Sequence, residues 1–292
     1  MLRRILTKLL QQLSKLFLGK GFIDKFFPFL IPLFQKLYAS LQKELTKTVS
    51  IPLDLKLKVF TKDVGVGLPL ILKGQYEPKQ TELFMQSLKT GDIFFDIGAN
   101  VGYYTLLASK TVGKTGKVVA FEPDKENFSM LEGNLKLNNC QNVEAIDKAV
   151  SDIDGPILFN TEKNNKGESA ISKNGKTEIT STTLDLFFSQ NHLLPAVIKM
   201  DIEGAEILAL KGGKNFFNSY KNLKLFIEFN PSSLKGFGNN PDLLITTLLD
   251  LNLKIEQIID ESRSLVLPYS KENLEQILKH TTYCNLYCEK ES

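Results

Sequence analysis

Asp96 stands near the end of a short apolar run, in the stretch Gly91 to Gly102 with the sequence GDIFFDIGANVG. Gly98, Asn100 and Gly102 alternate after it, and a helical pattern follows. Glycine adopts backbone angles that are closed to other residues and lets a ligand approach the main chain. The start of a helix presents backbone N–H groups that have no partner within the helix. The spacing therefore predicts a buried strand, a turn and a helix that form half of a nucleotide-type binding site.

A second carboxylate narrows the choice of ligand. Glu122 ends the next apolar run, GKVVAFEP, where it is placed to bind both hydroxyls of a ribose. A dinucleotide fingerprint would need glycine where this chain has Asn100 and Tyr103. Asp96 would repel a pyrophosphate and attract the ammonium group of a methionine. We therefore predict S-adenosylmethionine as the cofactor, with an NAD-dependent oxidoreductase on a similar sheet as the alternative. The residues expected to bind the cofactor in this half of the site are Asp96, Gly98, Asn100, Gly102 and Glu122.

Apolar runs and helical patterns alternate after this turn, which is typical of a parallel sheet with helices on both faces. We predict an α/β, Rossmann-like fold with a doubly wound, mostly parallel sheet of seven strands, in which a terminal hairpin adds an antiparallel strand. Strands are expected at 93–97, 117–121, 143–147, within AVIKMDIEGAE, and at 223–229, 253–259 and 282–288. Helices are expected at 103–112, 124–138, 242–251 and 271–279.

Two stretches fall outside this alternation. Residues 53–60 alternate apolar and polar side chains, and we predict a strand that pairs with 68–73 as a hairpin. Residues 155–183 are polar and rich in Gly and Asn, which predicts hairpin-like pieces with a mobile loop at 164–175. That loop either covers the substrate or is exposed to solvent.

Further candidates follow from the place where ligands bind in open parallel sheets, beyond the carboxyl ends of the strands. Asp147 and Ala149, in the turn DKAV, would border the adenine. Asp201 follows the fourth strand, next to the expected position of the transferred methyl group, and we predict that it contacts the cofactor or the methyl acceptor.

If the group that receives the methyl is a hydroxyl, catalysis should need a general base, because a hydroxyl is a poor nucleophile. Asp201 is the first candidate, and Glu228 on the adjacent strand is the second. Lys199 shares a strand face with Asp201 and either steadies developing negative charge or forms a buried ion pair. Glu206, and with it Glu203, has the position of a helix cap.

Four segments give a more specific indication, namely DIGANVGYYT, FEPDKENFSMLEGNLKLN, KAVSDIDG and IKMDIEGAE. They resemble the FkbM family of S-adenosylmethionine-dependent methyltransferases, and GQYEP and FIEF fit the same family. The resemblance covers roughly residues 70–230. It implies a class I methyltransferase fold and, usually, O-methylation of a hydroxyl on a sugar, a glycan or another small metabolite. A non-catalytic, membrane-associated module that keeps the fold is the alternative.

Charge is unevenly distributed along the 292 residues. Residues 1–62 contain 12 Lys or Arg and three Asp or Glu, whereas the remainder contains 24 and 30. This acidic balance predicts that the catalytic portion does not bind nucleic acid. The odd number of cysteines indicates a reducing compartment, and we expect a cytoplasmic protein. The cysteines are Cys140, Cys284 and Cys288.

No group of Cys, His and Asp shows the spacing of a metal site, so the sequence predicts no metal. The two histidines, His192 and His280, have no motif around them and are expected in loops or at the surface.

The basic N-terminal segment has a pattern of its own. Leu, Ile and Phe recur at helical spacing over residues 2–17, with basic residues off the apolar stripe. We divide the chain into a basic amphipathic helical segment, 1–50, and a methyltransferase domain, 51–292. The segment is expected to cap the domain or a second subunit, or to contact the inner face of a membrane peripherally through residues 1–38. Its longest uncharged run, Phe26 to Gln35, is too short to cross a bilayer.

Overall fold

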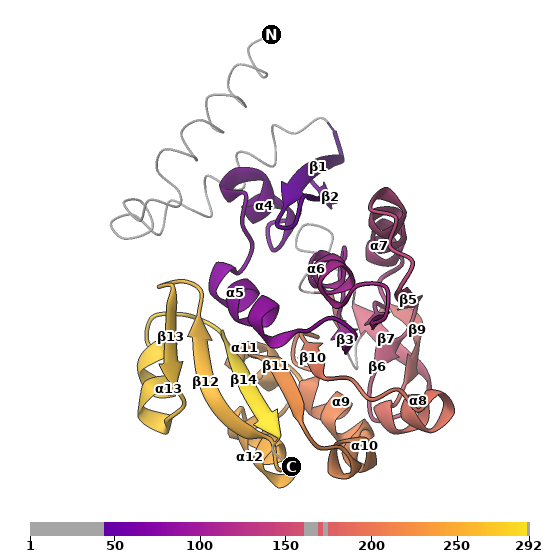
Figure 1. Ribbon diagram of the computed structural model, residues 1–292. Helices are drawn as coiled ribbons and strands as arrows, with labels where there is room; N and C mark the ends of the chain where they lie inside the picture. The colour runs from indigo at the N-terminus through magenta and orange to yellow at the C-terminus, as the bar shows by residue number, and fades with distance from the viewer. Residues whose placement is uncertain (1–43, 161–168, 172–174, 291–292) are drawn as a thin grey trace. The chain divides into compact units, whose positions relative to one another are not determined.

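The structure is a computed structural model that describes residues 44–160, 169–171 and 175–290 (Figure 1). The described residues form two compact units, which divide at Tyr76. The predicted N-terminal helix and membrane contact, and most of the predicted mobile loop, lie outside the described residues. The division of the chain at residue 50 stays a prediction.

The smaller unit differs from the hairpin that the sequence predicted. Strands β1 (Thr46–Ile51) and β2 (Leu55–Phe60) pair with each other as an antiparallel hairpin, so β1 begins inside the segment that was expected to be helical. The predicted partner of β2 is instead a helix, α4 (Gly67–Lys73). The reason is local, because the Asp63 carboxylate accepts the backbone N–H groups of residues 65–67 and starts the helix.

The main sheet of the larger unit confirms the predicted doubly wound fold. Its strand order is β13-β12-β14-β11-β10-β3-β4-β5, in which β5, β4, β3, β10 and β11 run parallel. The terminal hairpin inserts β14 antiparallel to both β11 and β12, as predicted. Strand β13 is an eighth strand that pairs with β12 at the edge, where its exposed side chains gave no alternating pattern. The strands are β3 (Ile93–Ile97), β4 (Lys117–Phe121), β5 (Val143–Ile146), β10 (Val197–Met200), β11 (Leu223–Phe229), β12 (Lys254–Asp260), β13 (Leu265–Pro268) and β14 (Cys284–Lys290).

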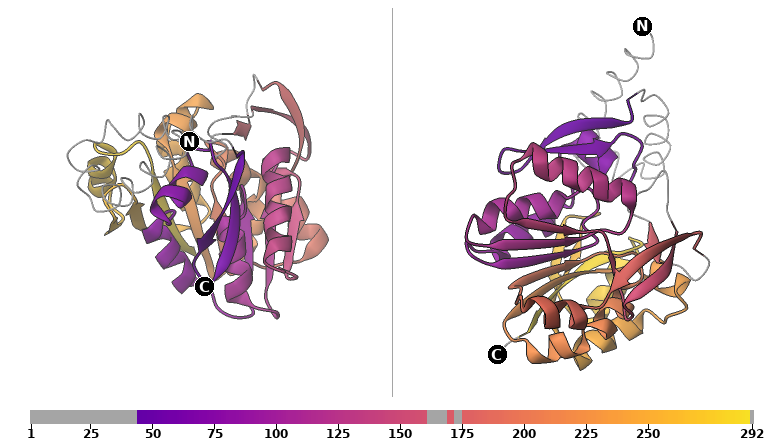
Figure 2. Two further views of the ribbon diagram at one scale, coloured as in Figure 1. Left: turned by 90° about the horizontal axis from the view of Figure 1, so that it is seen from above. Right: turned by 90° about the vertical axis from the view of Figure 1, so that its right-hand side faces the viewer.

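Helices cover both faces of this sheet (Figures 1 and 2). Helices α5, α6 and α7 lie on one face, and α8, α9, α10 and α12 lie on the other. Successive side chains of β3 point to opposite faces of the sheet, and both faces are apolar. Phe95 packs edge-on against Phe187 of α8, whereas Phe94 packs against Phe84 of α5. The helices are α5 (Pro78–Ser87), α6 (Tyr103–Val112), α7 (Lys125–Leu137), α8 (Leu184–Asn191), α9 (Glu206–Gly212), α10 (Lys214–Ser219), α11 (Pro231–Gly236), α12 (Asp242–Asp250) and α13 (Lys271–Leu278).

A smaller sheet of four strands, in the order β6-β9-β7-β8, accounts for the hairpin-like pieces predicted after residue 155. Its strands are β6 (Ala149–Val150), β7 (Gly155–Asn160), β8 (Ala170–Ile171) and β9 (Thr177–Thr182). Within the part of the chain that the structure describes, no helix is long and apolar enough to cross a membrane.

Candidate active site

The turn after β3 is held against the ends of two neighbouring strands. The backbone N–H groups of Gly98 and Ala99 both donate to the carbonyl oxygen of Phe121, at the end of β4. Gly98 has a φ of 86°, and a Cβ at this position would lie 2.0 Å from the carbonyl oxygen of Asp201. Only glycine permits this approach, so the loops after β3, β4 and β10 meet at one edge of the sheet.

Glu122 fastens the same turn from the tip of β4. One of its carboxylate oxygens accepts the backbone N–H of Asn100 at 2.7 Å, and the other accepts the N–H of Asp124 at 2.8 Å. Burial raises the pKa of Glu122 to about 8, although both donors act in the opposite direction. Asn100 takes a left-handed φ of 51°, which Asn tolerates better than most residues. The predicted ribose-binding carboxylate is therefore part of the turn that would hold the rest of the cofactor.

Asp96 lies beneath α6 rather than at the open tip of β3. Its side chain is buried and accepts a hydrogen bond of 2.5 Å from the Thr105 hydroxyl. Burial raises the pKa of Asp96 to about 6, while Lys199 and Thr105 lower it. A direct contact between this carboxylate and a methionine ammonium stays a prediction.

Lys199 is a buried cation at the centre of the edge. Only 4% of its surface is exposed, and its register partner on β3 is Asp96. The Nζ donates to Asp201 Oδ2 at 2.8 Å and lies 4.8 Å from the centre of the Tyr104 ring. Burial by itself would lower the pKa of Lys199, but the nearby carboxylates of Asp201, Glu77 and Asp96 raise it overall. The buried ion pair considered from the sequence is present.

Glu77 belongs to this cluster and was not singled out from the sequence. It stands before Pro78 at the start of α5, with a left-handed φ of 42°. Its carboxylate accepts hydrogen bonds from the Tyr104 hydroxyl and from the amides of Gln80 and Asn285. Burial raises the pKa of Glu77 to about 7, while Lys199 lowers it. Its sequence signal is the segment GQYEP, in which the acid directly precedes Pro78.

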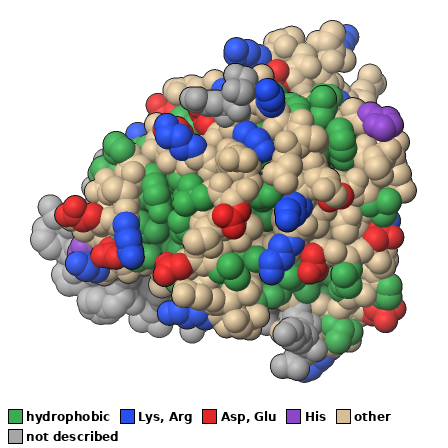
Figure 3. All heavy atoms as spheres, turned by 90° about the horizontal axis from the view of Figure 1, so that it is seen from below, with side chains coloured by type: hydrophobic (Ala, Val, Ile, Leu, Met, Phe, Trp, Pro, Cys, Tyr) green, Lys and Arg blue, Asp and Glu red, His purple; other side chains and the backbone are tan. Residues whose placement is uncertain are grey.

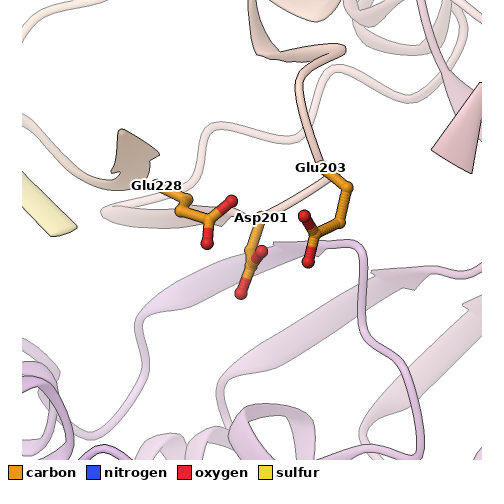
Figure 4. Close-up of side chains that lie close together, drawn as sticks. All are labelled: Asp201, Glu203 and Glu228. Carbon is orange, nitrogen blue, oxygen red and sulfur yellow. The ribbon is translucent and has the colours of Figure 1, made fainter. Parts of the chain in front are cut away.

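Three carboxylates gather where β10 and β11 end. Oxygens of Asp201, Glu203 and Glu228 all lie within 4.8 Å of one another, and Figure 4 shows their carboxylates facing one another. Burial raises the pKa of Glu228 well above its usual range, and the neighbouring carboxylates raise it further. Sequence spacing gave no indication of this group, since its members come from two different strands.

The predicted cap role of Glu206 is wrong, because Glu206 is the first residue of α9, Ala205 is the N-cap, and no side chain caps the helix. The Oε1 of Glu206 accepts the backbone N–H groups of Ile202 and Gly204 and so holds the turn after β10. Glu203 instead accepts a hydrogen bond from the Ser233 hydroxyl and joins the carboxylate group.

The remaining predicted residues lie at different distances from this edge. Asp147 directly follows β5, beside the tip of β4, and forms an ion pair with Lys125. Ala149 is buried in β6, where it pairs with Ser181 of the smaller sheet. A contact of either residue with adenine stays a prediction. The histidines, His192 and His280, are exposed, as expected.

The strand order, the glycine turn after β3 and the acid at the tip of β4 are those of the Rossmann-like fold of class I methyltransferases. The chain belongs to the methyltransferase FkbM domain family, whose family model matches residues 96–261. S-adenosylmethionine is accordingly its cofactor.

A curated relative is the hexuronic acid methyltransferase AglP of Haloferax volcanii, which is 27% identical over 139 residues. The match covers 47% of this chain and 56% of AglP, so the chain spans about half the length of that relative. Among solved structures, a SAM-dependent methyltransferase from Aquifex aeolicus matches with a TM-score of 0.42 and 18% identity, over 75% of this chain and 92% of the other. A TehB-like methyltransferase from Corynebacterium glutamicum matches with a TM-score of 0.43 and 13% identity, over 77% and 94%. Both TM-scores are below 0.5, so these two structures add no evidence on the fold beyond the strand order itself.

Proposed function

We propose that the chain transfers a methyl group from S-adenosylmethionine to a hydroxyl of a sugar, a glycan or another small metabolite. The close contact between Gly98 and the Asp201 carbonyl carries the proposal, because it joins the cofactor turn to the carboxylates of β10 and β11. Bound S-adenosylmethionine supplies an electrophilic methyl group. The protein has to hold the acceptor oxygen beside it, exclude water and receive the proton of the hydroxyl.

The donor set of the cofactor half fits S-adenosylmethionine. A carboxylate offers about four lone-pair positions, and on Glu122 the two backbone N–H groups and the Asn127 side chain use three of them. The remaining position can accept one ribose hydroxyl, and a second hydroxyl would take the place of the Asn127 side chain, without loss of the turn. Gly98 and Gly102 both take positive φ, and the space left by their missing side chains is filled by the Asp201 carbonyl and the Leu131 side chain, so these glycines shape the turn that would hold the cofactor.

In the acceptor half, Asp201 is our first candidate for the base. Its side chain is 22% exposed, whereas that of its partner Lys199 is 5% exposed, so Asp201 is the member of the pair that a substrate can reach. Lys199 fixes one carboxylate oxygen, and the other keeps its lone pairs for further contacts, of which the acceptor hydroxyl is one. Glu228 is the second candidate. Lys199 also offsets the negative charge that several buried carboxylates place around the reaction.

The acceptor is tested best with a panel. The name of AglP points to a hexuronic acid as one acceptor class, but the carboxylates of Asp201, Glu203 and Glu228 would repel an acidic sugar unless a cation lies between them. We therefore propose incubating the full chain with isotopically labelled S-adenosylmethionine and a panel of neutral sugars, hexuronic acids and small alcohols. A methyl ether in the product supports the proposal, whereas methylation at nitrogen or carbon contradicts it.

Two measurements test the machinery apart from the acceptor. S-adenosylhomocysteine at 100 times its dissociation constant should stabilise the fold by about 2.7 kcal/mol, and NAD should have no effect. A stabilisation by NAD alone would favour the oxidoreductase alternative. Once an acceptor is known, Asp201→Asn should lower turnover more than cofactor affinity. Turnover of this variant at the wild-type rate would remove Asp201 from catalysis.

We further propose a cytoplasmic protein without a nucleic-acid partner. The three cysteines are free thiols, which supports a reducing compartment. On the face shown in Figure 3, basic, acidic and hydrophobic side chains are intermingled, which does not favour binding of a polyanion.

For the N-terminal segment we keep both predicted roles and favour the cap, on the domain or on a second subunit. Deleting residues 1–43 leaves strand β1 intact and separates the two roles. A lower melting temperature after deletion would support a cap. Unchanged stability, with only the full chain sedimenting with anionic liposomes, would support a membrane contact.

A further inference from the structure

The carboxylates of Asp201, Glu203 and Glu228 have the spacing of ligands that share one cation. Their oxygens lie within 4.8 Å of one another, and two oxygens on opposite sides of a Ca²⁺ ion, each at about 2.4 Å, would be about 4.8 Å apart. Mg²⁺ and Mn²⁺ would need a slightly closer arrangement. Oxygen ligands are the kind that all three ions prefer.

Glu228 provides a second, independent indication. Its side chain is only 7% exposed, and its buried Oε2 has no hydrogen-bond partner. Figure 4 shows that its carboxylate faces Asp201. A buried carboxylate oxygen normally has a partner, because its removal from water costs free energy that a partner offsets. A cation between the three side chains would supply that partner.

The surroundings hold the three ligands in place. Lys199 donates to one oxygen of Asp201, and the Ser233 hydroxyl donates to Glu203. Glu206 fixes the turn that carries Glu203, through the backbone N–H groups at its two sides. Outer contacts of this kind orient the ligands of metal sites.

We propose that Asp201, Glu203 and Glu228 bind a divalent cation, Mg²⁺, Mn²⁺ or Ca²⁺, at the carboxyl ends of β10 and β11. Three protein ligands leave coordination positions for other oxygens. Resting on the proposed function, we assign two of these positions to neighbouring hydroxyls, or to a hydroxyl and a carboxylate, of the acceptor. The cation would then admit acidic sugars that the carboxylates alone would repel.

Binding is tested on the purified full chain after treatment with a chelator, without cofactor or acceptor. Mn²⁺ is titrated and followed by electron paramagnetic resonance, and competition with Mg²⁺ and Ca²⁺ gives the preference. We expect one bound Mn²⁺ per chain. Glu228→Gln and Glu203→Gln should each weaken binding about tenfold or more, since even outer contacts of metal sites are worth about 10–100-fold. Glu144→Gln, which removes one member of an exposed ion pair with Lys117, is the matched control and should bind as the wild type does.

The melting temperature of each variant shows whether it is folded, and Glu203→Gln serves as the second variant because Glu203 is less buried than Glu228. Absence of Mn²⁺ binding at about 1 mM, the weak end of protein calcium sites, overturns the proposal, as does equal binding by the wild type and both variants. Binding of S-adenosylhomocysteine to the same metal-free sample is measured in parallel. If S-adenosylhomocysteine binds and Mn²⁺ does not, the metal site alone is overturned. If S-adenosylhomocysteine does not bind, the proposed function is overturned instead.

Discussion

The contacts of Glu122 lead to a prediction that depends on pH. Its two carboxylate oxygens face two backbone N–H donors, and burial raises its pKa to about 8. The protonated acid is neutral, with one O–H donor and a carbonyl oxygen that accepts, and a glutamine amide is likewise neutral, with an NH2 group that donates and a carbonyl oxygen that accepts. Glu122→Gln therefore imitates the acid form and removes only the ionised form, in which both oxygens accept hydrogen bonds.

The size of the effect follows from the charge of the ionised form. A hydrogen bond to a charged group contributes about 1.5–3 kcal/mol, and 1.4 kcal/mol corresponds to a tenfold change in affinity. Loss of one such bond to a ribose hydroxyl should weaken binding about 10-fold to 150-fold at about pH 9, where the wild-type carboxylate is ionised. At about pH 6 both proteins present a neutral side chain, and their affinities should agree within about threefold.

Isothermal titration calorimetry with S-adenosylhomocysteine at both pH values measures this ratio. The amino group of the ligand titrates equally in both experiments and cancels in the comparison between variants. Glu132→Gln, an exposed position on α7, is the control and should match the wild type throughout. A ratio that is the same at both pH values would refute the assignment of the ribose to Glu122, provided that the variants remain folded.

Three further predictions concern stability. Gly98→Ala should lower the melting temperature and abolish binding of S-adenosylhomocysteine, because the new Cβ would lie 2.0 Å from the Asp201 carbonyl oxygen. The control is Gly133→Ala, whose Cβ would meet nothing within 4 Å. This variant should have unchanged stability or be more stable by about 0.5–1 kcal/mol. Lys199→Met should lower the free energy of unfolding, measured by urea denaturation, by about 3–5 kcal/mol, because it leaves buried carboxylates without their cation. Lys117→Met, which removes one member of an exposed ion pair, should lower it by only about 0–1 kcal/mol. Equal losses in the two variants would contradict this prediction. The ligand-free protein should lose stability as the pH rises from about 5 to about 8, because the folded state, with the pKa of Glu122 raised from 4.5 to about 8, binds more protons than the unfolded state in that range. Melting temperatures measured across this range should fall less steeply for Glu122→Gln, and parallel curves would be inconsistent with this assignment.

Much of the larger unit could be predicted because its elements are marked locally. Strands β3, β4 and β11 and helix α6 begin and end at the predicted residues. Strands that are buried on both faces appear as continuous apolar runs between turn residues. The order of strands and helices then placed Glu122 and Asp201 on one edge, since the carboxyl ends of parallel strands meet there, whereas Asp96 is buried beneath α6.

The hairpin of the smaller unit could not be predicted for a local reason. Leu53 and Asp54 both take left-handed φ angles, 63° and 59°, in the turn between β1 and β2. Such turns are usually marked by Asn-Gly or Asp-Gly, and this one has neither. Leucine disfavours a left-handed φ, and the antiparallel pairing of β1 with β2 offsets this local cost at Leu53.

The sequence by itself therefore determined the fold class, the cofactor and the residues at the tips of the strands, because these depend on local pattern and strand order. Only the tertiary structure decided which acids share an environment. Glu77 reaches Tyr104 and Asn285, which are distant in the chain, and Glu228 comes within reach of Asp201 through the pairing of β11 with β10. Whether a carboxylate is buried, and what lies opposite its oxygens, depends on the packing of helices against the sheet, and no linear pattern records that packing.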